Sequence, residues 1–500
     1  MGYAQVRAVA VVGMAGQLVV VESDVASGLP CLVMSGLPDA ALTQSRDRVR
    51  AAVVNSGETW PQRRLTVNLL PAHLPKHGSS FDLAVAMSLL AAVGAVPAEA
   101  LREAVLIGEL GLDGAVRPVR GVLPAVLAAM RHGLRYAVVP AANAVEAALV
   151  PGIVVKATDT LRRLIDFLRC DGQLLDPPPA AAVDEPPLLD LADVVGQDRG
   201  RRAVELAAAG GHNLALFGPP GAGKTMLAQR LPTVLPPLDD AAALEVTAVH
   251  SLAGTLPAES PLIRRPPFQA PHHTASVAAL VGGGSGIGRP GALSKAHHGV
   301  LFLDEAPEFS VNALEALRQP LEEGVVRISR SRAEVVYPAR TQLVLAANPC
   351  PCAKPGGDRH CECAPVARRR YLSRLSGPLL DRVDLRVMLA PVAPAALLGE
   401  HDAESSEAVA GRVVRARASA AERWGTTNAL VSARTLRGPR FRLPGACTAP
   451  LAKDVERGLV SARGHDRVIR LAWTMCDLDG RTFPDLADVC EAMDLRRGTP

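Results

Sequence analysis

A glycine-rich segment of eight residues constrains this chain more than any other feature of its sequence. The segment matches the pattern G-x-x-x-x-G-K-[ST], follows the apolar run Asn213–Phe217 and opens a helix-like run, Lys224–Leu231. In such a turn the glycines let backbone N–H groups surround phosphates, and the helix N-terminus adds partial positive charge. We therefore expect ATP and Mg²⁺ to bind here, with Lys224 on the β/γ phosphates and Thr225 on the metal. The segment consists of Gly218, Pro219, Pro220, Gly221, Ala222, Gly223, Lys224 and Thr225.

Two further apolar runs end in polar residues that suit hydrolysis. Val300–Leu303 leads into Asp304 and Glu305, which we expect to orient Mg²⁺ and to polarise the attacking water, respectively. Gln342–Ala346 leads towards Asn348, which would hold the same water from the other side. The alternatives are an acidic helix N-cap for the two carboxylates and a turn cap for Asn348.

Consecutive prolines mark the clearest domain boundary. They fall within residues 176–187, and prolines of this kind stop helices and central strands and stiffen a linker. We predict one domain at residues 1–171, a linker at 172–188, a second domain at 189–391 and a third at 392–500. Strand-like and helix-like runs alternate in the first two domains, which predicts an α/β fold with a parallel sheet around the glycine-rich segment. The third domain reads as a small helical lid.

A larger set of segments carries a family resemblance that runs nearly end to end. These segments are residues 36–39 (GLPD), 64–69 (RLTVNL), 108–114 (GELGLDG), 270–276 (APHHTAS), 317–322 (LRQPLE), 348–352 (NPCPC) and 379–384 (LLDRVD). With them the chain resembles the ComM/YifB proteins, which are AAA+ ATPases related to the magnesium-chelatase ATPase subunit and the MCM helicases. The resemblance implies a Lon-protease-like N-terminal domain, an AAA+ P-loop core, a C-terminal helical lid and a homo-oligomer, a hexameric ring with ATP between subunits.

By the same resemblance, two arginines complete the catalytic site. Arg382 matches the arginine finger that reaches the γ-phosphate of the neighbouring subunit, where a fixed guanidinium stabilises charge in the transition state. Arg463 matches the sensor-2 arginine of the lid. For either residue the alternative is a surface ion pair.

The family is associated with moving DNA, since ComM proteins are described as hexameric helicases that migrate branches during recombination. The implied partner is single-stranded or branched DNA. Here Val325–Val336 reads as a β-hairpin with Arg330 and Arg332 at its tip, which would contact phosphates without sequence preference, and residues 281–286 suit a second pore loop. Aromatic residues make up only 3% of the chain, so we do not expect DNA to be bound mainly by stacking of its bases on aromatic side chains. The alternative is a solvated hairpin tip.

The Lon-like resemblance of the N-terminal domain does not extend to its catalysis. It places Ser80 at the position of the Lon nucleophile, but Leu123 stands where the basic lysine belongs. Because a serine without a base is not activated, we expect this domain to be non-catalytic, a scaffold or substrate-binding module.

Four of the nine cysteines form a cluster that resembles a metal site. Two C-x-C pairs can meet one tetrahedral Zn²⁺, and His360 can replace one ligand; free thiols in a loop are the alternative. The pairs His272-His273 and His297-His298 favour a structural or pore-facing role. The clustered cysteines are Cys350, Cys352, Cys361 and Cys363.

Two rival functions stay open at this stage: a chelatase-type ATPase that drives metal insertion into a tetrapyrrole, and a protein-remodelling ATPase. The net charge of +4 permits nucleic-acid binding without requiring it. The longest uncharged apolar stretch, Leu83–Val96, is too short to span a bilayer, and no secretory signal is convincing. We expect a cytoplasmic protein that does not contact a membrane.

Overall fold

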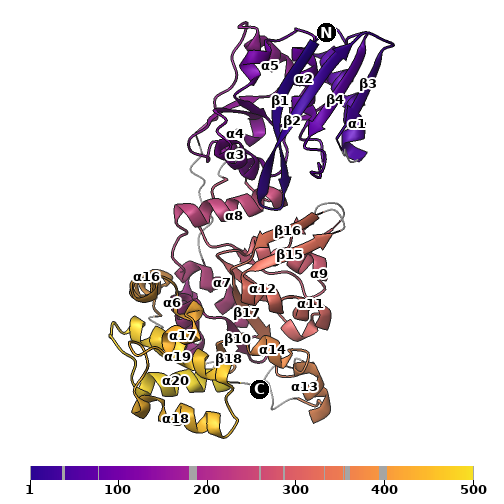
Figure 1. The fold of residues 1–500 in the computed structure, drawn as a ribbon. Helices are drawn as coiled ribbons and strands as arrows, with labels where there is room; N and C mark the ends of the chain where they lie inside the picture. The colour runs from indigo at the N-terminus through magenta and orange to yellow at the C-terminus, as the bar shows by residue number, and fades with distance from the viewer. Residues whose placement is uncertain are drawn as a thin grey trace.

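The computed structural model describes residues 2–36, 40–76, 78–179, 189–257, 261–284, 288–330, 333–352, 354, 361–392 and 403–498. The side chains of residues 40–43, 330 and 333 are outside this description. Figure 1 shows an N-terminal sheet domain at one end of the molecule, the P-loop sheet in the middle and the C-terminal helices beside that sheet. Among the described helices, none is both long enough and apolar enough to cross a bilayer.

The N-terminal domain is a mixed seven-stranded sheet in the order β3-β4-β2-β1-β5-β8-β9. Its strands β1 and β2 form a long antiparallel hairpin, β2 and β4 are also antiparallel, and the remaining neighbours are parallel. Helix α2 is buried along its whole length, as its apolar sequence requires. The strands are β1 (Gly2–Val12), β2 (Ala15–Ala26), β3 (Cys31–Ser35), β4 (Arg64–Leu70), β5 (Ala104–Leu106), β8 (Tyr136–Pro140) and β9 (Val154–Thr158), with the short pair β6 (Glu109–Leu110) and β7 (Val116–Arg117). The helices are α1 (Ala40–Asn55), α2 (Asp82–Ala92), α3 (Val122–Arg131), α4 (Ala144–Ala147) and α5 (Leu161–Leu168).

The central domain is built on a five-stranded, all-parallel sheet in the order β11-β14-β17-β10-β18. Alternate residues of its strands enter two different cores: Leu214 and Leu216 lie in one, and Ala215 and Phe217 in the other. This is the pattern of strands covered by helices on both faces. The strands are β11 (Phe268–Gln269), β14 (Val300–Leu303), β17 (Gln342–Ala347), β10 (Leu214–Phe217) and β18 (Leu385–Met388). The helices are α6 (Asp198–Gly210), α7 (Lys224–Val234), α8 (Asp240–Ala253), α9 (Val277–Val281), α10 (Ala292–Lys295), α11 (Val311–Ala316), α12 (Arg318–Glu323), α13 (Pro365–Leu372) and α14 (Gly377–Leu380).

The strand order has a direct consequence for the site. Because β14, β17 and β10 are neighbours and parallel, their carboxyl ends meet at one edge of the sheet. Ligands of open parallel sheets bind at that edge. The residues that follow these three strands, Asp304, Asn348 and Gly218, are therefore brought together by the topology.

The hairpin predicted from the sequence forms between α12 and β17, from the antiparallel strands β15 (Val325–Arg330) and β16 (Ala333–Pro338). The turn of the long β1–β2 hairpin contacts it: a Cβ added at Gly13 would lie 2.7 Å from the Val335 side chain, and Val12 and Met14 pack on the same core. Two antiparallel hairpins from different domains are thus in contact with one another (Figure 1).

Helix α8 links the central domain to the N-terminal domain. It packs against α3, and Ala248 joins the core of the N-terminal domain. At the contact, the Glu146 carboxylate accepts hydrogen bonds from the Ser251 hydroxyl and, at 2.9 Å, from the backbone N–H of Leu123. Burial raises the pKa of Glu146, and these donors oppose that shift.

The C-terminal domain is helical, with α16 (Ser406–Trp424), α17 (Ala433–Leu436), α18 (Gly445–Glu456), α19 (Ala462–Leu478) and α20 (Leu486–Arg497). Its centre is aromatic: Trp473 makes edge contacts with Trp424 and Phe441, and Arg423 lies over both indole rings. Arg423 also forms an ion pair with Asp477, which fixes its guanidinium there. Helices α16 and α19 pack on α6, so this lid is fastened to the P-loop sheet.

Candidate active site

The glycine-rich turn connects β10 to α7 and has the backbone shape that its sequence predicts. Gly221 and Gly223 have φ values of 77° and 84°, a region that residues with a Cβ rarely adopt. The buried Gln197 holds the turn in place, because its side-chain amide donates to the carbonyls of Ala222 (3.0 Å) and Ala390 (2.7 Å). The sequence reading missed Gln197, whose only signal is its position just before α6.

Lys224 is buried at the centre of the turn. Its ammonium donates to the carbonyls of Gly218 (2.7 Å) and Pro219 (2.9 Å) and to Oδ1 of Asn348 (2.9 Å). Burial lowers the pKa of Lys224, and the charges of Asp304 and Glu305 oppose that shift. A triphosphate in the turn would exchange loop carbonyls for phosphate oxygens around the same ammonium, which is the role expected of this lysine.

Thr225 and Asp304 lie at a distance that suits Mg²⁺. The Thr225 hydroxyl donates to Oδ2 of Asp304 at 2.8 Å. Two adjacent ligands of an octahedral magnesium ion, each about 2.1 Å from the metal, are about 3.0 Å apart. These two oxygens therefore fit adjacent positions of such an ion, which would neutralise charge on the phosphates when bound.

Glu305 follows Asp304 with a left-handed backbone, φ 49° and ψ 43°. Residues with a side chain seldom adopt this conformation, and it costs on the order of 1 kcal/mol or more and recurs at active sites. The Glu305 carboxylate lies 3.5 Å from Nδ1 of His273, which comes from the loop after β11. We had expected a structural or pore-facing role for the pair that contains His273, and its approach to Glu305 had no signal in the local sequence.

The two predicted arginines lie away from the P-loop of the same chain. The backbone carbonyl of Arg382 accepts a hydrogen bond from Asn213 at 2.9 Å, at the amino end of β10, whereas the P-loop starts at the carboxyl end. The strand between them is about 13 Å long. Arg382 pairs with Glu322, and Arg463 lines the same cavity of about 420 Å³. The structure thus places both arginines together at the edge opposite to Lys224.

The expected DNA-contacting residues are only partly described. Arg332 lies outside the described residues, and Arg330 is described by its backbone alone, as the last residue of β15 opposite Ala333. The predicted linker at residues 172–188 is described only as far as residue 179, because residues 180–188 lie outside the described residues.

The second histidine pair takes part in an ion-pair cluster. Nε2 of His297 lies 3.2 Å from Glu245, and Nε2 of His298 lies 3.5 Å from the same carboxylate. Because Nδ1 of His297 accepts a hydrogen bond from the Arg340 N–H, the proton of its neutral ring is on Nε2 and faces Glu245. That arrangement favours the structural reading over a metal ligand.

The family resemblance places Ser80 at the position of the Lon nucleophile and Leu123 at the position of its base. Leu123 is buried and apolar. Lys76, the nearest lysine in the sequence, is held by the carbonyls of Gly36, Pro71 and Leu74 at 2.6–3.2 Å. Burial lowers the pKa of Lys76, and the three carbonyls occupy the three N–H donors of its ammonium group.

We predict that the N-terminal domain does not cleave peptides, because Leu123 stands where the resemblance places the base for Ser80. The measurement is the release of fluorescent peptides from labelled casein by the full-length protein with ATP. The expected rate equals that of the Ser80→Ala variant. Cleavage that is lost in Ser80→Ala would contradict this prediction.

Comparisons with known proteins account for nearly the whole chain. The family model described as "Magnesium chelatase, subunit ChlI" matches residues 190–397, "Subunit ChlI of Mg-chelatase" matches 21–143, and "Magnesium chelatase, subunit ChlI C-terminal" matches 403–496. The chain is 55% identical to an uncharacterized protein of Mycobacterium tuberculosis, over 98% of this chain and 97% of that protein.

Two relatives carry the names that the sequence motifs suggested. The chain is 41% identical to YifB of Escherichia coli, over 97% of this chain and 96% of YifB. It is 39% identical to the competence protein ComM of Haemophilus influenzae, over 99% of this chain and 98% of ComM. A shorter match joins it to the Lon protease of Roseiflexus castenholzii, 33% identical over 138 residues, which are 26% of this chain and 17% of that protease.

Proposed function

Since the chain belongs to the ComM/YifB family and is an AAA+ ATPase with magnesium-chelatase-like domains, we propose that it works as a ring that uses ATP hydrolysis to move along single-stranded or branched DNA. The setting would be recombination or DNA uptake. The observation that carries this proposal is the position of the β15–β16 hairpin in the chain.

The hairpin lies between the two strands that carry the hydrolytic residues. Asp304 and Glu305 follow β14, the chain then runs through α11 and α12 into the hairpin, and β17 leads from the hairpin to Asn348. Because β14 and β17 are hydrogen-bonded neighbours, a shift at either strand end would move the hairpin base. This supports a device that moves with the nucleotide state.

The chemistry at the phosphates is divided among the residues of one edge. Lys224 would bind and orient the terminal phosphates, and Thr225 and Asp304 would hold the metal ion that neutralises their charge. Glu305 would polarise the attacking water, and Asn348, which is hydrogen-bonded to Lys224, would position that water from the other side. No residue of this set supplies a positive charge opposite to Lys224.

The missing charge would come from a neighbouring subunit. Arg382 and Arg463 lie at the far edge of the sheet, where they cannot reach the P-loop of their own chain. In a head-to-tail ring, the edge of one subunit faces the opposite edge of the next. A ring therefore completes each site with Arg382 as the finger and Arg463 beside it.

If the hairpin arginines bind DNA phosphates, the affinity for DNA should fall steeply as the salt concentration rises. In a hexamer, Arg330 and Arg332 would offer roughly a dozen guanidiniums to the phosphate backbone, and log affinity falls with log salt by about 0.7–0.9 per neutralised phosphate. The Arg330→Ala/Arg332→Ala variant should bind a forked oligonucleotide more weakly, with a flatter slope and unchanged ATP affinity. Fluorescence anisotropy of a labelled forked oligonucleotide at several salt concentrations gives the DNA affinity and the slope. A titration with a fluorescent ATP analogue gives the ATP affinity.

A matched control removes two arginines elsewhere. Arg46→Ala/Arg50→Ala changes the net charge equally, on α1 of the N-terminal domain, and should keep the wild-type slope. If the hairpin variant matches the wild type in affinity and slope, the hairpin does not hold DNA. ATP turnover stimulated by an unfolded protein, or by a metal-free tetrapyrrole together with Mg²⁺, and not by DNA, would then favour the remodelling or chelatase function.

A further inference from the structure

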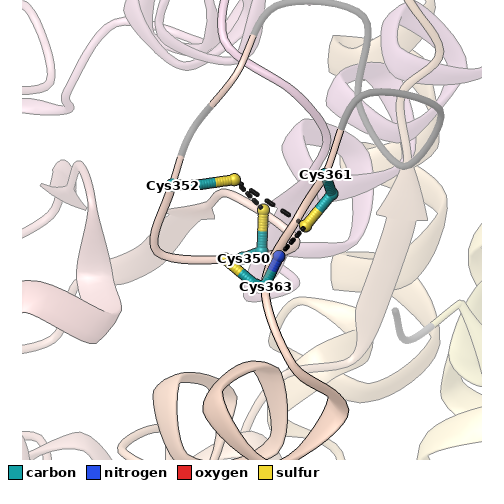
Figure 2. Close-up of side chains that lie close together, drawn as sticks. All are labelled: Cys350, Cys352, Cys361 and Cys363. Atoms are coloured by element: carbon teal, nitrogen blue, oxygen red, sulfur yellow. Dashed lines mark hydrogen bonds between the residues drawn. The ribbon is translucent and has the colours of Figure 1, made fainter.

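The four clustered cysteines come together in space, although they stand in two pairs in the chain. Their sulfurs all lie within 4.8 Å of one another, and Figure 2 shows them gathered around one point. The Sγ atoms of Cys350 and Cys352 are 3.2 Å apart, and those of Cys352 and Cys361 are 3.7 Å apart. Four sulfurs about 2.3 Å from one zinc ion would be separated by about 3.8 Å.

These separations distinguish a metal site from a disulfide. A disulfide requires an S–S distance of about 2.05 Å, well below either separation. In a C-x-C pair only one residue lies between the cysteines, so the sulfurs approach each other without strain around a shared ion. Cys350 is buried and the other three cysteines are partly exposed, so the cluster lies close to the surface.

Two backbone N–H groups donate to sulfurs of the cluster. Cys363 donates to the sulfur of Cys361 at 3.4 Å, and Lys354 donates to the sulfur of Cys352. Each donor stands two residues after the sulfur that accepts, which is the first cysteine of one pair and the second cysteine of the other. Donors of this kind stabilise thiolate ligands and orient them towards a metal.

The segment that follows the cluster supplies positive charge. Helix α13 begins two residues after Cys363 and carries Arg368, Arg369 and Arg370. Arg368 donates towards the sulfur of Cys361. A Zn²⁺ ion with four thiolates has a net charge of about −2, so a neighbouring arginine side chain offsets part of that charge.

We infer that Cys350, Cys352, Cys361 and Cys363 bind one structural Zn²⁺ and that this ion fixes the position of Asn348 relative to α13. This inference goes beyond the proposed function, because it does not depend on whether the ATPase acts on DNA, on proteins or on a tetrapyrrole. His360, the alternative ligand in the sequence, lies outside the described residues together with residues 353 and 355–359.

The location gives the ion a positioning role. Cys350 stands two residues after Asn348, which bonds Lys224. Just beyond the C-terminal end of α13, Arg374 donates to the carbonyl of Pro307 at 3.0 Å and lies 3.3 Å from Glu308, in the 3-10 turn that follows Glu305. The zinc site together with α13 would thus connect Asn348 to the turn after Glu305.

The test starts with the metal content of the purified full-length chain. Elemental analysis after gel filtration in a weak chelator is expected to give about one zinc per chain. The Cys361→Ser/Cys363→Ser variant is expected to lose it, whereas Cys490→Ser, which alters an exposed cysteine outside the cluster, keeps it. Cobalt exchanged into the wild type should give the strong visible absorption of a tetrahedral tetrathiolate site.

The positioning role has its own readout. If the ion holds Asn348 and the Glu305 turn in place, the double variant should lose kcat on the order of tenfold while its affinity for an ATP analogue changes little. A wild-type chain with no stoichiometric zinc, with iron in its place, or with all four thiols free to react would overturn the inference. Because the wild-type content decides this, misfolding of the variant cannot obscure the result, and failure of DNA binding would leave it intact.

Discussion

Replacing Lys224 with Ala is expected to weaken ATP binding by one to two orders of magnitude and to abolish turnover, whereas Glu305→Gln should bind ATP normally and lose hydrolysis. Lys224 is the buried cation of the turn, and a hydrogen bond to a charged group contributes about 1.5–3 kcal/mol, or roughly 10- to 150-fold in Kd. Glu305 contacts His273 and not the turn itself, so its removal should spare binding.

The expected loss in Glu305→Gln lies in kcat, by about 10²- to 10⁴-fold, because the amide has the shape of the carboxylate but cannot accept the proton of the water. Fluorescent-nucleotide titration and phosphate release measure the two effects separately. Circular dichroism melting is the control for Lys224→Ala, which also loses the bond to Asn348. Wild-type turnover by Glu305→Gln would remove Glu305 from the mechanism.

The sequence predicted which strand-end residues lie together at one edge of the sheet, and their roles in hydrolysis stay predictions. Each of Gly218, Asp304 and Asn348 follows a short apolar run, and parallel strands bring such residues to one edge. The hairpin and the lid helices were also recognisable, because their periodicities of two and 3.6 residues are local properties. The predicted bounds differ slightly from those observed: the hairpin expected at Val325–Val336 extends to Pro338.

The remaining contacts depend on tertiary packing, which no local pattern encodes. Gln197 reaches the P-loop and Ala390 from the start of α6, and His273 reaches Glu305 from the loop after β11. Similarly, the bond between Ser251 and Glu146 joins residues 105 positions apart in two domains. A single sequence does not reveal such pairs, since their partners are set by how the helices dock.

The Arg382→Ala variant is expected to lose about 10³-fold or more in kcat with little change in ATP affinity, the range over which an arginine finger acts. The reason is positional: Arg382 lies at the amino edge of the sheet, so it contacts no nucleotide bound to its own chain. Arg382→Lys should recover only part of the rate, because the ammonium lacks the fork of donors of a guanidinium. Phosphate release and nucleotide titration give both values.

Mixing two inactive variants decides whether Arg382 acts on the neighbouring subunit. Lys224→Ala keeps its finger and Arg382→Ala keeps its P-loop, so random co-assembly would restore about one quarter of the interfaces of a head-to-tail ring. Turnover should therefore reappear in the mixture. Lys224→Ala mixed with Glu305→Gln is the matched control, because both changes fall on the same half of the site and no interface regains both Lys224 and Glu305. Co-assembly verified by light scattering, with no recovered turnover in the first mixture, would show that Arg382 is a surface ion-pair partner of Glu322 and that the charge opposite Lys224 comes from elsewhere.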